Sequence, residues 1–336
     1  MQEQTTQDQN SRMLLEVRDL QVSFVTRKMK VPTIRNISYE LREGEVLGIV
    51  GESGSGKSVS SNAIFKLLPD NAIIDSGEVL FEGQDLLKMT KAQLRSIRGK
   101  SIAEIFQDPM TSLDPLFTIE YQLEEVLKKH TQLDRSERVA RMIELLELVG
   151  INQPQRRLKQ YPHEFSGGMR QRAMIAMALA CEPKLLIADE PTTALDVTIQ
   201  AQIIELLKEL KDKFHMSIIF ITHDLGVVAN ICDRILVMYA GEIIESGDKR
   251  QIFYHYQHPY TEGLIRSIPD VVGDEKKPLI PIRGNPPEMS LLHEECAFAR
   301  RCPYAMKICA AARPPQVDLG DGHMMRCFRT AGHTEE

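Results

Sequence analysis

The sequence has neither an excess of positive charge nor a long apolar run. Its 336 residues carry a formal net charge of −6, which excludes an overall basic field that would hold nucleic acid or an anionic membrane surface. A phosphate compound can still bind at a local site. The longest apolar runs, such as SIIFI at 217–221, have the length of a strand, whereas a transmembrane helix needs roughly 18–20 residues. We therefore expect no membrane span.

The N-terminus lacks the features of a targeting segment. Residues 1–12 read MQEQTTQDQNSR, with neither a basic start nor an apolar core, so we expect no signal peptide and a short disordered tail. These absences favour a cytosolic protein, one that can still dock on a membrane protein. In a reducing cytosol, clustered cysteines are more often metal ligands than disulfides.

Buried strands alternate with helices over much of the chain. Apolar runs at 184–191 and 216–224 predict buried strands, and 197–214 predicts an amphipathic helix capped by Asp196. This alternation is typical of an α/β fold with a parallel sheet and helices on both faces. A helical block over about 115–180 interrupts it, and we interpret that block as a subdomain.

Other segments predict antiparallel strands and a change of character near the C-terminus. LLEVRDLQVSF at 14–24 alternates like a half-buried strand, and 234–248 predicts a hairpin that turns at Ala240 and Gly241. From about residue 266 the sequence becomes proline-rich and irregular. We place a domain boundary there, which leaves 266–336 as a C-terminal extension.

GESGSGKS at 51–58 is the strongest chemical signal. It follows a predicted buried strand and precedes a predicted helix, the context of a phosphate-binding loop. Its glycines let backbone N–H groups converge on phosphates, and the helix N-terminus adds partial positive charge. A Gly/Ser linker that matches by chance is the alternative, which the flanking strand and helix disfavour. We expect Lys57 to reach the β- and γ-phosphates and Ser58 to bind Mg²⁺. The expected nucleotide-binding residues of this loop are Gly51, Ser53, Gly54, Ser55, Gly56, Lys57 and Ser58.

LLIADE at 185–190 brings two carboxylates to the end of a buried strand. Ligands of parallel sheets bind at this end. Asp189 suits Mg²⁺, and Glu190 is placed to polarise an attacking water. Taken alone, the pair could equally be a helix cap or a solvated loop. Together with a phosphate-binding loop, it indicates a nucleotide hydrolase.

FSGGMRQR at 165–172 predicts a second anion-binding site. Ser166, Gly167 and Gly168 precede a good helix and leave its N-terminal N–H groups open to a ligand. An ordinary serine N-cap is the alternative for this octet in isolation. One chain with one phosphate-binding loop has no evident use for two such sites.

Together these motifs resemble those of the ATP-binding-cassette (ABC) ATPases, over roughly residues 13–265. In that family they are the Walker A motif, the Walker B motif and the signature. Further matches are Phe24 where an aromatic stacks on adenine, Gln107 of a Q-loop, Ala194-Leu195-Asp196 of a D-loop and His223 of a switch loop. The resemblance implies a P-loop NTPase cassette with a RecA-like parallel sheet core, an antiparallel β subdomain and a helical subdomain.

The resemblance also explains the second anion-binding site. Two ABC cassettes pair head to tail, and the signature of one closes on the ATP held by the other. Ser166 and Gly168 would then touch the γ-phosphate of the partner's ATP, and Asp196 would lie at the same composite site. Gln107 would contact Mg²⁺. Glu190, His223 and Gln107 are the expected catalytic residues.

Three segments and the tail indicate one branch of the family. FQDPMTSLDP (106–115), LLIADEPTTALDVTIQAQI (185–203), HPYTEGLIRSIP (258–269) and the tail resemble the oligopeptide, dipeptide and nickel importers, and most of all the ATP-binding subunits of oligopeptide permeases. The expected function is ATP hydrolysis that powers oligopeptide import from the cytoplasmic face of the inner membrane. The alternatives are a dipeptide or nickel importer ATPase and a soluble ABC ATPase that acts as a switch.

The importer resemblance implies partners. They are a second, homologous ATPase subunit, two transmembrane permease subunits and an extracytoplasmic peptide-binding protein that acts through the permease. No nucleic acid is among the partners.

Four cysteines lie in the last part of the chain. Cys296, Cys302, Cys309 and Cys327 are separated by five, six and seventeen residues, which fits neither a zinc knuckle nor a bacterial ferredoxin. The spacing alone supports four thiolates on one metal centre or four unligated thiols. The resemblance to peptide permeases implies a [4Fe-4S] cluster, with Zn²⁺ as the alternative.

Overall fold

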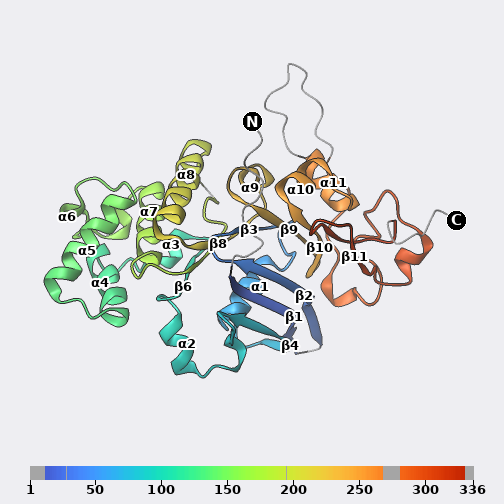
Figure 1. Cartoon of the computed structure of the whole chain (residues 1–336), viewed down its shortest axis with the longest axis horizontal. Coiled ribbons are helices and arrows are strands. Elements are labelled where there is room, and N and C mark those ends of the chain that lie inside the picture. The colour runs from blue at the N-terminus through green and yellow to red at the C-terminus, as the bar shows by residue number, and fades with distance from the viewer. Residues whose placement is uncertain (1–11, 28, 194, 268–280, 330–336) are drawn as a thin grey trace, which may run out of the picture.

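The computed structural model describes residues 12–27, 29–193, 195–267 and 281–329 (Figure 1). Nearly all of the predicted N-terminal tail lies outside these residues, as do Ala194 and part of the extension. The helical block forms one end of the molecule and the extension the other, with the main sheet between them (Figure 1).

The core is a sheet of eight strands in the order β11-β12-β10-β9-β3-β8-β7-β6. The five strands from β9 to β6 are parallel. They are β9 (Arg234–Tyr239), β3 (Val46–Val50), β8 (Ser217–Thr222), β7 (Leu185–Asp189) and β6 (Ile102–Ile105). Strands β3, β7 and β8 are buried along their whole length because both faces of the sheet are covered. The α/β class predicted from the sequence is confirmed.

An antiparallel sheet packs on one face of the core sheet. Its order is β2-β1-β4-β5, and its strands are β1 (Met13–Val25), β2 (Lys30–Arg42), β4 (Ala72–Phe81) and β5 (Gln84–Asp85). Ile219 and Ile221 of β8 point into the buried cluster between the two sheets, which also holds Ile64 of the helix α1 (Lys57–Ile64). The alternate residues Ile218 and Phe220 point to the opposite face.

Helices cover that opposite face. It is packed by α8 (Val197–Phe214), α9 (Leu225–Ile231), α10 (Lys249–Tyr254) and α11 (Pro259–Arg266). The helix α2 (Lys91–Ile97) instead packs Leu94 into the cluster between the two sheets. The helical block consists of α3 (Pro109–Ser112), α4 (Ile119–His130), α5 (Arg135–Leu148), α6 (Pro154–Arg157) and α7 (Gly167–Ala178). No helix of the described residues is both long and apolar enough to cross a bilayer.

The extension continues the core sheet. Strand β12 (Met324–Arg326) pairs antiparallel with β10 (Glu242–Asp248), and β11 (Gln316–Asp318) pairs with β12. The sequence analysis did not predict these two strands, whose three residues each are too few to carry a recognisable period. Phe298 of the extension packs on the core cluster, so the extension shares the hydrophobic core of the cassette.

Candidate nucleotide site

The phosphate-binding loop runs from the end of β3 to the start of α1. Two glycines are required by its path. A side chain on Gly51 would place its Cβ 2.2 Å from the carbonyl oxygen of Met238, so only glycine lets the loop pass this close to the neighbouring strand. Gly56 adopts φ 100°, a left-handed conformation that glycine takes without strain. The path of the loop therefore depends on glycine at both positions.

The side chain of Lys57 lies within the loop. Its Nζ donates hydrogen bonds to the carbonyl oxygens of Gly51 at 2.8 Å and Glu52 at 3.1 Å, and lies 4.0 Å from Oε1 of Glu190. Burial lowers the pKa of Lys57, an effect that the charge of Glu190 opposes. A buried ammonium group suits an anionic ligand. A phosphate oxygen would accept hydrogen bonds that Lys57 now donates to backbone carbonyl oxygens, and its negative charge would strengthen them.

The other loop residues differ in exposure. Ser53 and Gly54 are exposed, Ser55 is buried, and the side-chain oxygen of Ser55 has no hydrogen-bond partner among the described residues. The main chain of Ser55 is fixed, because its carbonyl oxygen accepts a hydrogen bond of 2.9 Å from the Gly241 N–H. This bond ties the loop to the β9–β10 turn.

Asp189 ends β7 beside Ser58. Burial raises the pKa of Asp189, while a hydrogen bond from the Ser58 side chain lowers it. Its Oδ1 is buried and has no hydrogen-bond partner among the described residues. An unpaired buried carboxylate oxygen is costly unless a ligand satisfies it. Oxygen donors of this kind suit Mg²⁺, so these two residues fit the predicted metal site.

Glu190 gathers the remaining predicted catalytic side chains. Its Oε2 accepts hydrogen bonds of 3.1 Å from Gln107 Nε2 and 2.9 Å from Thr193 Oγ1, and lies 3.3 Å from His223 Nδ1. Glu190 itself has a left-handed backbone, φ 46°, which is uncommon for a non-glycine residue and recurs at functional sites. Thr193 was not among the predicted site residues, and its only signal in the sequence is its position shortly after the acidic pair.

The signature residues lie apart from the phosphate-binding loop. Ser166 caps α7 and accepts a hydrogen bond of 3.4 Å from the Met169 N–H. A Cβ on Gly168 would lie 3.1 Å from Cγ2 of Ile199 on α8. No hydrogen bond or ion pair among the described residues joins Ser166, Gly167 or Gly168 to the phosphate-binding loop. Within the described part of the chain, the signature residues thus make no polar contact with the phosphate-binding loop.

Phe24 and Asp196 are the last two predicted site residues. Phe24 lies on β1, paired with Val31 of β2 and Ala72 of β4, and its side chain is partly exposed. Asp196 is exposed and caps α8 by accepting a hydrogen bond of 2.9 Å from the Ile199 N–H. Their predicted contacts with nucleotide stay predictions.

Two family descriptions match the chain. "ABC transporter" matches residues 34–193, and "Oligopeptide/dipeptide transporter, C-terminal region" matches residues 244–309. The oligopeptide transport ATP-binding protein of Bacillus subtilis is 54% identical over 94% of this chain and 88% of its own length. The dipeptide transport ATP-binding protein of the same bacterium is 50% identical over 94% of both. The chain belongs to the ATP-binding subunits of the oligopeptide/dipeptide ABC importers. It is an ABC-type ATPase.

Solved ABC cassettes share the fold. A dimeric cassette in a post-hydrolysis state bound to ADP and Pi is 29% identical, with a TM-score of 0.64 over 70% of this chain and 99% of that one. A cassette from Clostridium perfringens, part of an ABC transporter complex, is also 29% identical, with a TM-score of 0.61. The two cassettes cover 70% and 72% of this chain.

The four cysteines of this importer ATPase border one cavity. It is lined by Cys296, Cys302, Cys309 and Cys327 together with apolar side chains such as Phe298. None of the four is in a disulfide, and no group of three or more His, Cys, Asp or Glu side chains in the described part of the chain is arranged to hold a metal ion. The predicted iron–sulfur cluster and its zinc alternative stay predictions.

Proposed function

We propose that this ATPase powers the import of oligopeptides, with ATP bound at the phosphate-binding loop. Residues 51–58 would surround the phosphates with backbone N–H groups, and the N-terminus of α1 adds partial positive charge. Lys57 would exchange its bonds to loop carbonyls for bonds to phosphate oxygens. The buried, partly compensated charge of Lys57 supports this exchange.

Magnesium would be held by Ser58 and Asp189, with Gln107 close by. When bound, Mg²⁺ neutralises the charge that builds on the phosphates. The unpaired Oδ1 of Asp189 supports this assignment.

Glu190 would orient and deprotonate the attacking water. The convergence of Gln107, Thr193 and His223 on Oε2 of Glu190 is the observation that carries the proposal, because it fixes the carboxylate beside the buried lysine. His223 would contact the γ-phosphate and hold this geometry. A positioned base contributes about 10²- to 10⁴-fold to a rate.

The partners follow from the signature. Ser166, Gly168 and Asp196 would close on the ATP of a second, homologous ATPase subunit, and the dimeric state of a solved cassette supports such pairing. The pair would act at the cytoplasmic face of the inner membrane, on two permease subunits that receive peptide from an extracytoplasmic binding protein. ATP would favour the closed pair and hydrolysis would release it.

Oligopeptides are the proposed cargo because the oligopeptide relative shows the higher identity of the two Bacillus subtilis proteins, 54% against 50%. A dipeptide importer is the second candidate, favoured by the small size of that difference. Co-purification with two permease subunits under mild extraction tests the proposed assembly.

For the extension we propose a [4Fe-4S] cluster held by Cys296, Cys302, Cys309 and Cys327. A single zinc ion needs four sulfurs each about 2.3 Å from one centre, whereas a cubane binds each thiolate at a different iron and so accepts a wider set. The four thiols lie around one cavity, and this arrangement supports thiolates that bind four different irons. Analysis of the anaerobically purified chain tests this. About four irons and four sulfides per chain support it, and one zinc without iron would refute it.

Two substitutions test the ATPase assignment. Glu190→Gln should keep ATP binding and lower steady-state hydrolysis by about a hundredfold or more, because only the base is lost. Lys57→Ala should lose binding itself. Undiminished hydrolysis by Glu190→Gln would remove Glu190 from catalysis, and wild-type ATP affinity in Lys57→Ala would place the nucleotide elsewhere.

A further inference from the structure

The extension reaches back to the phosphate-binding loop through one ion pair. Arg301 donates two parallel hydrogen bonds to the carboxylate of Glu52, with Nη1 2.6 Å from Oε2 and Nη2 3.0 Å from Oε1. The Arg301 side chain is only 5% exposed. A paired fork of this kind is the strongest and most directional ion pair available to a protein. Glu52 is the second residue of the phosphate-binding loop.

The main chain of Glu52 is held as well. Its N–H donates a hydrogen bond of 2.9 Å to the Tyr260 hydroxyl, and its carbonyl oxygen accepts one of 3.1 Å from Lys57 Nζ. Arg301 also donates to the Tyr239 hydroxyl at 3.3 Å. Glu52 therefore lies between the lysine expected to bind phosphate and an anchor outside the cassette motifs.

The anchor is rigid. The rings of Tyr239, Tyr260 and Phe298 pack together with centroids 4.6–5.4 Å apart. The Arg301 guanidinium lies 5.8 Å from the Tyr239 ring centroid and 6.0 Å from that of Phe298. Tyr239 and Tyr260 are almost completely buried in the cassette, whereas Phe298 and Arg301 come from the extension. The aromatic cluster fixes the guanidinium in place.

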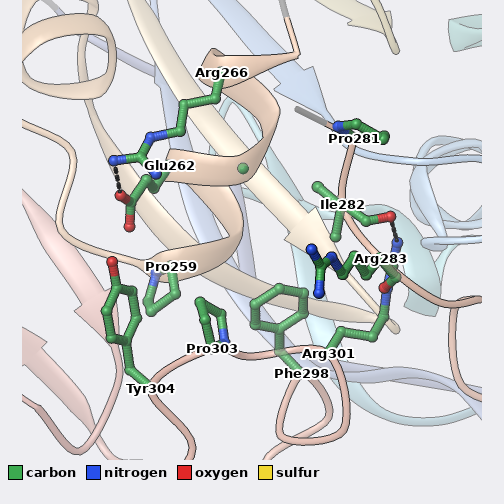
Figure 2. Close-up of a pocket in the computed structure, with 11 residues that line it drawn as sticks. Pro259, Glu262, Arg266, Pro281, Ile282, Arg283, Phe298, Arg301, Pro303 and Tyr304 are labelled. Atoms are coloured by element: carbon green, nitrogen blue, oxygen red, sulfur yellow. Dashed lines mark hydrogen bonds and ion pairs between the residues drawn. The ribbon is translucent and has the colours of Figure 1, made fainter. Parts of the chain in front are cut away.

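One further segment of the extension supports Arg301. Its Nε donates to the Arg283 carbonyl oxygen at 3.0 Å, and Nη2 lies 3.4 Å from that of Ile282. Figure 2 shows Ile282, Phe298 and Arg301 on one side of a cavity of about 280 Å³, with Glu262 and Arg266 on the other. Arg301 directly precedes Cys302, so the loop that carries it is also the cysteine loop.

We propose that Arg301 is a positioning residue that sets the shape of the phosphate-binding loop through Glu52, so that the extension controls the affinity of the cassette for ATP. The inference rests on the proposed nucleotide site. Arg301 touches no phosphate in this scheme. It holds the Glu52 peptide, and with it the approach of Lys57, in the conformation that binds nucleotide.

Binding of a fluorescent ATP analogue with Mg²⁺ to the full-length chain tests the proposal. Arg301→Ala should weaken binding about three- to tenfold, because a pre-organising pair of charge-assisted bonds is lost. Arg301→Lys should recover part of the affinity, since lysine keeps the positive charge but cannot donate the two parallel hydrogen bonds of the guanidinium group. Arg300→Ala is the matched control, an exposed neighbouring arginine that should bind within about twofold of the wild type.

Glu52→Gln is the second variant, and together with Arg301→Ala it completes a double-mutant cycle. If the two residues act as one unit, Glu52→Gln with Arg301→Ala should be no weaker than the worse single variant. In the assembled importer, Arg301→Ala should raise the KM for ATP while kcat changes less than about twofold. Glu52→Gln keeps the question answerable should Arg301→Ala fail to fold.

The outcomes separate the two proposals. Wild-type affinity in both Arg301→Ala and Glu52→Gln, alongside lost binding in Lys57→Ala, would overturn the role of Arg301 and leave the nucleotide site intact. Unchanged binding in Lys57→Ala would overturn the nucleotide site first.

Discussion

At the scale of single residues, His258 shows how burial fixes a protonation state. Its side chain is 2% exposed, and its Nδ1 accepts a hydrogen bond of 3.0 Å from the Tyr260 N–H, which requires an unprotonated nitrogen. Burial lowers the pKa of His258 to about 3. In the unfolded chain a histidine pKa is about 6.5. The folded state therefore resists a proton that the unfolded state accepts.

The first prediction is a pH dependence of stability that His258 causes. Above pH about 6.5 His258 is neutral in both the folded and the unfolded state, so it adds no pH dependence to the stability. As pH falls from about 6.5 towards 3, only the unfolded chain takes up the proton, so stability falls. His258→Asn keeps a helix-capping acceptor and should lose less of its thermal midpoint between pH 7.5 and 5 than the wild type does. His255→Asn, at an exposed position, is the control. Equal losses in all three proteins would contradict this reading.

Glu104 on β6 gives a prediction of opposite sign. Burial, and then the charge of Asp189, raises the pKa of Glu104 to about 8. The folded chain keeps a proton that the unfolded chain releases near pH 4.5, so stability falls as pH rises from about 4.5 to about 8. Glu104→Gln should match the wild type in thermal midpoint at pH 5 and exceed it at pH 9. Glu125→Gln, an exposed change, should show no such gain. A Glu104→Gln midpoint below that of wild type at pH 9 would refute the assignment.

At the scale of elements, the sequence predicted best what is built locally. The phosphate-binding loop and the acidic pair each lie between a buried strand and a helix, and the loop was recognisable because strand, turn and helix follow one another within about twenty residues. The signature was recognisable for the same reason, as a serine cap before a helix. Such units follow from local propensity and burial.

Contacts between distant segments were not predictable. Strands β11 and β12 are too short for a period, and their place at the sheet edge depends on β10. The ion pair of Glu52 with Arg301 joins residues 249 positions apart. Nothing in either local sequence marks such a partner, because the contact exists only once the extension packs on the aromatic cluster.

The third prediction concerns Ser166, which caps the N-terminus of α7. Ser166→Arg places a large charge where the signature should close on the partner's ATP. Nucleotide binding by the isolated chain should be unchanged, while hydrolysis by the assembled pair should fall severely, since the pair cannot close. Ser136→Arg, at an exposed position on α5, should affect neither. Loss of binding in the isolated Ser166→Arg chain would place the signature in the site of its own chain.

At the scale of the whole molecule, the extension is built into the cassette. It adds two strands to the core sheet, places Phe298 in the core, and forms ion pairs from Arg301 to Glu52 and from Arg313 to Glu242. His323 of the extension adds a buried contact of 2.9 Å with Glu245 of β10. Because these contacts join the extension to the cassette, we expect a change within the extension to affect the nucleotide site.

In the proposed function, ATP hydrolysis at Glu190 powers peptide import. Uptake of a labelled oligopeptide by cells that lack this subunit, supplied with the wild-type chain or with Glu190→Gln at equal expression, tests it most directly. The wild-type chain should restore uptake, and Glu190→Gln should not, although it still binds ATP and assembles with the permease. Equal uptake with both chains would contradict the claim, and so would uptake that the wild-type chain fails to restore.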